Sequence, residues 1–209
     1  MQHRQHGFTL IEIAIVLVII GVLLGGILKG QEMLTQSKIR AVEKELDGVA
    51  VAILGYRDRY KALPGDDPLA SGRWNGVGDG DADGKIAGNF NSSTGSDESM
   101  LGWQHLRLAG LIGGDSSNGK QPLNAAGGIT GFQTDLSNNT STLLHGTVIC
   151  TTNLAAKIAN AIDAQQDDGR PGQGSILGFQ QSAVNTPDFN TAITAYTDGA
   201  GQYTICRNV

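Results

Sequence analysis

The sharpest chemical pattern in the sequence is the acidic stretch GDGDADGKI at residues 78–86. Asp79, Asp81 and Asp83 stand at alternating positions, and a glycine follows them. Alternate carboxylates can converge on one hard cation while glycine permits the turn, so the stretch matches the first half of a calcium-binding loop. We therefore predict calcium as a cofactor, bound by these three carboxylates and by the backbone carbonyl of Lys85.

The second half of the calcium-loop pattern is missing. The twelfth position counted from Asp79 is Phe90, where such loops usually carry a bidentate glutamate. Asp97 or Glu98 could replace it from the helix that we expect next, and Asp66-Asp67 could add ligands. The alternative is a solvated loop in which the aspartates bond to their own backbone.

The sequence also indicates a specific bond between its two cysteines, Cys150 and Cys206. If the domain is exported to an oxidising compartment, a single disulfide is the simplest interpretation. The alternative is two unpaired, buried thiols.

Enzyme chemistry finds little support. The histidines are His3, His6, His105 and His145, and they show no paired metal-ligand spacing. There is no Gly-x-Ser-x-Gly motif, and Cys150 lacks a convincing base. We expect no catalytic activity. The net charge of −5 also disfavours a nucleic-acid partner.

These residues must be positioned by larger elements, and the first of them is apolar. Residues 8–28 carry a single charge, Glu12. A helix of this length spans about 31 Å, enough for a bilayer core. A secretory signal has a shorter apolar core followed by its cleavage site, and a buried helix is rarely apolar on all faces. We predict a retained membrane helix.

The flanks of this helix indicate its orientation. The leader, residues 1–7, carries Arg4 and no acidic residue. The positive-inside rule keeps such a leader in the cytoplasm and sends the C-terminal part across the membrane. Lys29 on the other flank reduces the charge difference.

Glu12 needs a partner, because an ionised carboxylate in lipid costs about 2.5–3.5 kcal/mol even on the lenient insertion scale. No lysine or arginine lies within the apolar run. If the chain were cut after Gly7, Phe8 would carry a free amine. A salt bridge between this amine and Glu12 of a neighbouring copy would set the register of an assembly.

The stretch GFTLIEIAIVLVIIGVLL resembles the class III signal of type IV prepilins and type II secretion pseudopilins. The resemblance covers about the first 30 residues. It implies that prepilin peptidase cuts after Gly7 and methylates Phe8, and that Glu12 pairs with a neighbouring subunit. The sequence departs from many pilins at Lys29, where they carry a proline.

A one-sided helical stripe follows the apolar segment, and we expect one helix to continue to about Ala62, before Pro64. Its apolar residues are spaced alternately three and four apart: Ile39, Val42, Leu46, Val49, Ile53, Tyr56 and Tyr60. This stripe is typical of a helix that packs on a globular domain. A self-standing coiled coil is the alternative.

The rest of the chain predicts a mixed domain. We expect a first helix capped by Ser96 and ended by Gly113-Gly114. We expect strands 192–197 and 202–208 to form a hairpin around residues 198–201. The predicted helices are 96–112 and 151–169, and the predicted strands are 143–151, 192–197 and 202–208. The acidic run at 163–172 is interpreted as a helix end and a turn.

The fold class is therefore α+β, with the lollipop organisation of a pilin: a long N-terminal helix, membrane-spanning in its first half, packed on a loop-rich globular domain with a small antiparallel sheet. The expected parts are a leader at 1–7, a transmembrane and assembly helix at 8–30, its amphipathic continuation at 31–62, and a globular periplasmic or extracellular domain at 63–209.

We expect a structural subunit of a type IV filament system. Its partners would be itself and other pilin-like subunits, prepilin peptidase, the bacterial inner membrane and an inner-membrane assembly platform. It would be a single-pass inner-membrane protein with its C-terminal domain outside the cytoplasm, and then part of a pilus or periplasmic pseudopilus. The alternatives are a pseudopilin of a type II secretion system and a membrane-anchored binding protein that never polymerises.

Overall fold

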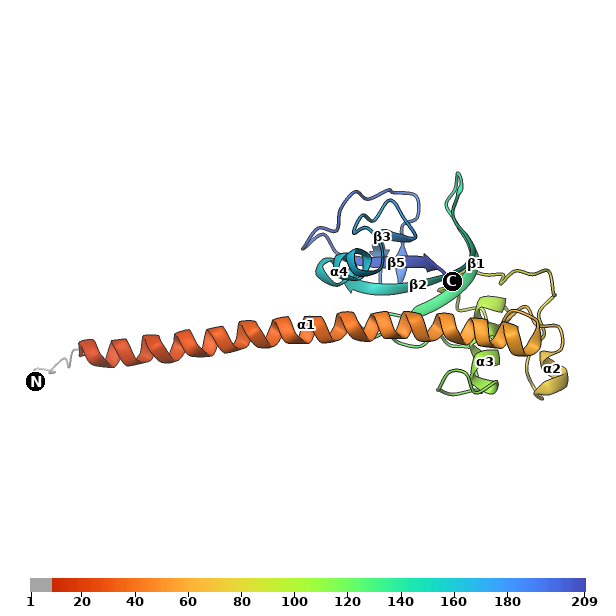
Figure 1. Ribbon diagram of the computed structural model, residues 1–209, viewed down its shortest axis with the longest axis horizontal. Helices are drawn as coiled ribbons and strands as arrows, with labels where there is room; N and C mark the ends of the chain where they lie inside the picture. Colours follow the sequence, from red (N-terminus) through yellow and green to blue (C-terminus); the bar gives the residue numbers. More distant parts are fainter. Residues whose placement is uncertain (1–8) are drawn as a thin grey trace, which may run out of the picture. The chain divides into compact units, whose positions relative to one another are not determined.

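The computed structural model describes residues 9–209. The chain divides into two units, one that ends at Ser37 and one that comprises Lys38–Val209. Helix α1 (Leu10–Tyr60) begins in the first unit and ends in the second (Figure 1). The predicted long N-terminal helix is confirmed, and it ends before Pro64, as we expected.

The buried side of α1 in the second unit follows the predicted stripe. Six of the seven stripe residues are buried, and Tyr60 is half-buried. They pack in one core with Trp103 from α3 (Glu98–Leu108) and with Ile149 and Ile205 from the sheet. Each fully buried aliphatic side chain contributes about 1.5–3 kcal/mol, so this stripe fixes the C-terminal part of α1 on the domain.

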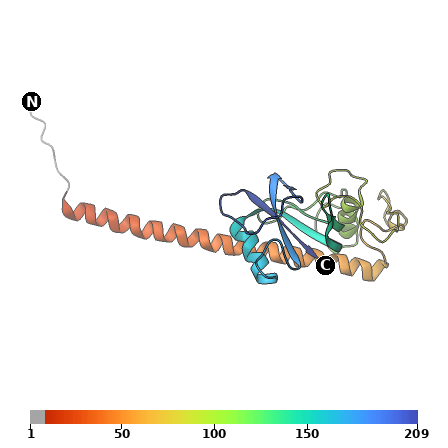
Figure 2. The ribbon, with the colours of Figure 1, turned by 90° about the horizontal axis from the view of Figure 1, so that it is seen from above.

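The second unit contains one antiparallel sheet with the strand order β1-β2-β5-β3-β4 (Figure 2). The strands are β1 (Thr130–Ser137), β2 (Thr142–Ala155), β3 (Ile176–Ala183), β4 (Thr186–Pro187) and β5 (Gln202–Asn208). Helix α4 (Ala156–Gln166) contacts β2, β3 and β5 (Figure 1). The α+β class, with a long helix and an antiparallel sheet, is thereby confirmed.

The predicted hairpin of 192–197 with 202–208 is wrong. The second segment is β5, but the first is not a strand. Strand β5 already pairs with β2 on one edge and with β3 on the other, so no free edge is left for residues 192–197. This segment instead contributes Tyr196, whose ring packs edge-on against Tyr203.

The bounds of the predicted helix at 96–112 also need correction. Helix α3 begins at Glu98 with Asp97 as its N-cap residue, so Ser96 is not the cap. The Asp97 side chain makes no capping bond, and its Oδ2 accepts a hydrogen bond from the Ser92 hydroxyl. The helix ends at Leu108, and Gly110 with a φ of 69° turns the chain before Gly113-Gly114 is reached.

The predicted helix at 151–169 starts too early. Residues 151–155 continue β2, and only α4 (Ala156–Gln166) is helical. Thr151 pairs with Ile205 of β5, and the Thr152 N–H donates to the carbonyl of Ile129. These cross-strand bonds satisfy the backbone of a buried segment, which the apolar spacing of the helix pattern does not reveal. Helix α2 (Ala70–Arg73) was not predicted.

Candidate functional site

The N-terminus of α1 gives Glu12 a local partner. Its Oε2 accepts hydrogen bonds from the Thr9 N–H at 2.7 Å and from the Thr9 hydroxyl at 2.8 Å. Thr9 immediately precedes the helix, so Thr9 and Glu12 form a capping box, in which both side chains satisfy helix-end groups. This role was not predicted, although its signal, Thr-x-x-Glu before an apolar run, is present in the sequence. The predicted cleavage residues, Gly7 and Phe8, lie outside the described residues.

The apolar part of α1 is exposed over its whole length. Every residue from Leu10 to Lys29 is exposed in the chain as described. Among residues 9–209, α1 is the helix that is long and apolar enough to span a membrane. Leaving so many aliphatic side chains in water is unfavourable, and a lipid bilayer or other apolar helices would cover them.

The predicted disulfide is present. Cys150 and Cys206 are bonded, and they lie opposite each other on the neighbouring strands β2 and β5. Both are buried in a second apolar cluster that includes Phe90, Leu136 and Phe179. The bond links residues 56 positions apart in sequence and ties the C-terminal strand to the sheet.

Four carboxylates from three segments meet beside the end of α1. Asp66, Asp81, Asp83 and Glu98 each offer an oxygen, and these oxygens lie within 4.8 Å of one another. We call this set the four-carboxylate cluster. Asp66 and Glu98 are buried, whereas Asp81 and Asp83 are exposed. An arrangement of this kind could hold a metal ion.

Two glycines allow the three segments of the four-carboxylate cluster to approach. A Cβ on Gly80 would lie 2.3 Å from the Cα of Asp66, and one on Gly65 would lie 2.2 Å from the carbonyl oxygen of Glu98. Gly65 also has a φ of 99°, which disfavours other residues. Any larger residue at either position would push the segments apart.

Backbone amides bind part of each carboxylate in the four-carboxylate cluster. Glu98 accepts from the Asp81 N–H at 3.1 Å and from the Ala87 N–H at 2.8 Å. Asp66 accepts from the Gly84 N–H through Oδ2 at 2.9 Å. The other Asp66 oxygen, Oδ1, is buried and has no hydrogen-bond partner. Burial raises the pKa of the Asp66 carboxyl, and the nearby charges of Glu98 and Asp83 add to this effect.

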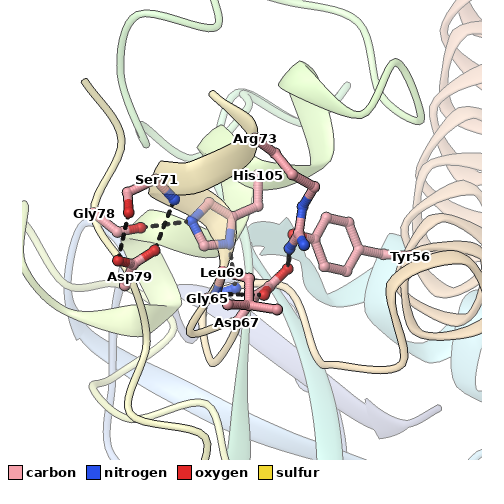
Figure 3. Close-up of polar contacts among 9 residues, drawn as sticks. All are labelled: Tyr56, Gly65, Asp67, Leu69, Ser71, Arg73, Gly78, Asp79 and His105. Carbon is pink, nitrogen blue, oxygen red and sulfur yellow. Dashed lines mark hydrogen bonds and ion pairs between the residues drawn. The ribbon is translucent and has the colours of Figure 1, made fainter. Parts of the chain in front are cut away.

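The structure brings together only part of the carboxylates that the linear calcium-loop pattern aligned. It brings together Asp81 and Asp83 but not Asp79, whose two oxygens accept from the N–H and the hydroxyl of Ser71 at 2.7 and 2.6 Å (Figure 3). These bonds lower the pKa of Asp79. The Lys85 N–H donates to Asp83 Oδ1, and the role of its carbonyl stays a prediction. Glu98, which the sequence offered in place of the missing glutamate, and Asp66, which it offered as an additional ligand, complete the cluster.

Figure 3 shows a polar network around Asp67. Asp67, adjacent in sequence to Asp66, is buried and accepts from the Tyr56 hydroxyl at 2.6 Å, and it pairs with Arg73. Burial raises the pKa of the Tyr56 phenol, so it remains a hydrogen-bond donor. No pattern in the sequence predicted this triad.

His105 connects two loop segments around the same network. It is fully buried; its Nδ1 accepts from the Gly65 N–H and its Nε2 lies 3.0 Å from the carbonyl oxygen of Gly78 (Figure 3). This pattern requires the neutral imidazole with its proton on Nε2. Burial lowers the pKa of His105 and favours that form.

Residues 2–28 match the family described as the prokaryotic N-terminal methylation motif. A search of curated proteins found no match. The motif and the apolar helix that begins within it fit a membrane-anchored protein with a prepilin-type signal. The chain therefore carries the N-terminal signal that type IV pilin-like and pseudopilin proteins share, and this motif implies processing by prepilin peptidase and pilin-like assembly.

Proposed function

We propose that this protein is a structural, non-catalytic subunit of a type IV filament system that polymerises through α1. The observation that carries the proposal is the methylation motif at residues 2–28, joined to a helix whose apolar residues are exposed. Cleavage after Gly7 and methylation of Phe8 would release a mature subunit, and packing against neighbouring apolar helices would cover α1.

Before assembly, the protein would be a single-pass protein of the bacterial inner membrane. The leader would stay in the cytoplasm and the C-terminal domain would lie outside it. The charge of the leader supports this orientation. The disulfide between Cys150 and Cys206 supports it independently, because such bonds persist in oxidising compartments.

The proposed assembly contact is a salt bridge between Glu12 of one subunit and the Phe8 amine of another. The capping box offers a competing reason for a carboxylate at this position. Glu12→Gln separates the two, because glutamine can also complete a capping box but carries no charge. Loss of fibres in Glu12→Gln would support the salt bridge. Normal fibres in Glu12→Gln but not in Thr9→Ala would assign Glu12 to the cap.

The mass of the mature protein tests the whole proposal. Protein is recovered from sheared extracellular fibres and from washed membranes, and its intact mass is measured. A form lacking residues 1–7 with one added methyl group, abundant in fibres, is expected for a surface pilin. The same form confined to the envelope would favour a pseudopilin of a secretion system. The full-length mass in both fractions would overturn the proposal and favour a non-polymerising anchor.

We also propose calcium as the ion of the acidic region. All the groups offered there are carboxylates, and calcium takes six to eight oxygen ligands in irregular geometry, whereas magnesium demands a near-ideal octahedron. Isothermal titration of the full-length protein in detergent micelles with calcium chloride tests this. We expect saturable calcium binding that added magnesium does not abolish. The absence of binding at millimolar calcium would exclude calcium.

A further inference from the structure

We infer that the ion is held by Asp66, Asp81, Asp83 and Glu98, and that it cross-links the three chain segments that supply them. This inference rests on the proposed calcium binding but names a different ligand set from the linear calcium-loop pattern. In that pattern Asp79 would be the first ligand. In the structure both Asp79 oxygens bind Ser71 instead.

The first support is a buried oxygen that lacks a partner. Asp66 is 4% exposed, and its Oδ1 accepts no hydrogen bond, while its Oδ2 accepts from Gly84. A buried carboxylate oxygen without a donor is costly, because nothing replaces the water it loses on folding. A cation among the four carboxylates would remove that cost.

The second support is the charge of the cluster. Within residues 9–209 no lysine, arginine or histidine forms an ion pair with any of its four carboxylates. Arg73, the cation of the adjacent network, pairs with Asp67 instead. Carboxylates this close repel one another unless a proton or a cation intervenes. A divalent ion would balance half of the charge that the cluster carries when it is fully ionised.

The third support is that Asp66 can be reached from solvent and that the loop carrying Asp81 and Asp83 has an uncommon backbone conformation. Asp66, Ala82 and Gly84 line a hollow that opens to the surface, so an ion can reach the buried carboxylate from solvent. Ala82 has a φ of 62°, which is uncommon for a residue with a side chain. The turn at 81–84 thus holds a less favourable backbone conformation between the two exposed ligands, Asp81 and Asp83.

The ligand set has a structural consequence. Asp66 follows α1, Asp81 and Asp83 belong to the loop after α2, and Glu98 opens α3. An ion shared by these residues would hold the long loop region between α1 and α3 in one conformation. Without the ion, this region would keep its hydrogen bonds but would also keep the repulsion among its carboxylates.

Two variants distinguish the structural ligand set from the linear pattern. Calcium affinity is measured by isothermal titration of full-length protein in micelles, with Asp83→Asn and Asp79→Asn compared with the parent. Asp83 is exposed, so its replacement should leave the fold intact. We expect Asp83→Asn to weaken binding by about tenfold or more, as loss of a ligand does, and Asp79→Asn to bind like the parent.

The Asp79 variant also separates the two proposals. If the parent binds no calcium, the proposed ion is wrong. If the parent binds but Asp79→Asn abolishes binding while Asp66→Asn and Asp83→Asn do not, calcium stands and this ligand set is overturned.

Limited proteolysis tests the cross-link. Cleavage between residues 61 and 97 should slow about tenfold when calcium replaces EDTA, because an ion that binds only the folded loop reduces its open fraction. Cleavage in the exposed turn at 198–201, whose neighbourhood is hydrogen-bonded to Gln180 and Tyr203, serves as the internal control and should not change. Equal slowing at both places, or none between 61 and 97, would overturn the cross-link.

Discussion

The second unit contains two groups of neighbouring carboxylates, and they differ in how their oxygens are satisfied. In the four-carboxylate cluster the buried Asp66 Oδ1 has no partner. The second group is Asp163, Asp167 and Asp168, at the end of α4. There the buried Asp163 accepts through both oxygens, from the Gly169 N–H at 3.1 Å and the Tyr196 hydroxyl at 2.7 Å.

The rest of the second group is also bound to the chain itself. Asp167 Oδ2 accepts from the N–H groups of Ser175 and Ile176, and Asp168 Oδ1 accepts from the Arg170 N–H. The comparison shows that closeness of carboxylates does not define an ion site. What matters is whether buried oxygens remain without donors once the fold has formed. This difference supports the ion that we propose for the first group and indicates a structural role for the second.

The disulfide is a cross-link that needs no ion, so the stability lost on its removal is a reference for the effects expected in the two carboxylate groups. Replacing both Cys150 and Cys206 by alanine should lower the free energy of unfolding by about 4 kcal/mol in the loop-entropy model. Urea unfolding of full-length protein, followed by tryptophan fluorescence, measures this loss. We expect the same loss in calcium and in EDTA. A loss seen only in EDTA would mean that the ion and the disulfide constrain the same region.

Asp163→Ala tests the structural role of the second group. It leaves the Tyr196 hydroxyl and the Gly169 N–H without their acceptor, so we expect a loss of about 2–3 kcal/mol in the free energy of unfolding. Asp168→Ala is the matched control, since this exposed side chain accepts one bond from its own turn, and it should change stability by less than about 0.5 kcal/mol.

We expect Asp163→Ala to lower the free energy of unfolding by the same amount in calcium and in EDTA. If calcium affinity falls in Asp163→Ala but not in Asp168→Ala, the second group takes part in ion binding, and the distinction between the two groups fails.

Asp66→Asn should change stability in opposite directions with and without calcium. In EDTA it removes a buried charge and its repulsion from Glu98 and Asp83, so we expect the variant to be more stable than the parent by about 1 kcal/mol. In calcium the parent gains binding free energy that the variant lacks, and the order reverses. Thermal unfolding in both buffers measures this. A variant less stable than the parent in both would show that the charge of Asp66 is satisfied without an ion.

The sequence predicted what depends on periodicity and on strong motifs. The buried stripe of α1, the methylation motif and the pairing of Cys150 with Cys206 follow from spacing, from an apolar run and from there being only two cysteines. The strands β1 and β3 were missed, because TGFQTDLS and ILGFQQSA mix glycine and polar residues without clear alternation.

The ligand set of the four-carboxylate cluster depends on tertiary structure. The linear pattern favoured Asp79, but which carboxylates meet is decided by the close approach of Gly80 to Asp66 and of Gly65 to Glu98. These contacts join residues far apart in sequence, and no local signal encodes them. The same holds for His105, whose partners lie 40 and 27 residues away.

The smallest effect that we predict is a difference in pH dependence between the two regions. Burial lowers the pKa of His105, so the native protein binds fewer protons at this residue than the unfolded chain as pH falls below the ordinary histidine value of 6.5. Its contribution to stability is complete above that pH and decreases below it. Burial raises the pKa of Asp163 above its ordinary 3.8, so the contribution of Asp163 increases as pH falls. Acid should therefore weaken the region around His105 and spare the second group.

The measurement is the free energy of unfolding between pH 7.5 and 5 in EDTA, with and without His105→Asn. Both proteins also carry Asp66→Asn, so that the titration of Asp66 does not contribute. The charged groups that face the imidazole, Arg73, Asp79 and Glu98, are present in both proteins compared. His105→Asn offers an acceptor to Gly65 and a donor to Gly78 but does not titrate, so its stability should fall less steeply below pH 6.5. Equal slopes would mean that His105 stays hydrogen-bonded when protonated and that the loops around it adjust to acid.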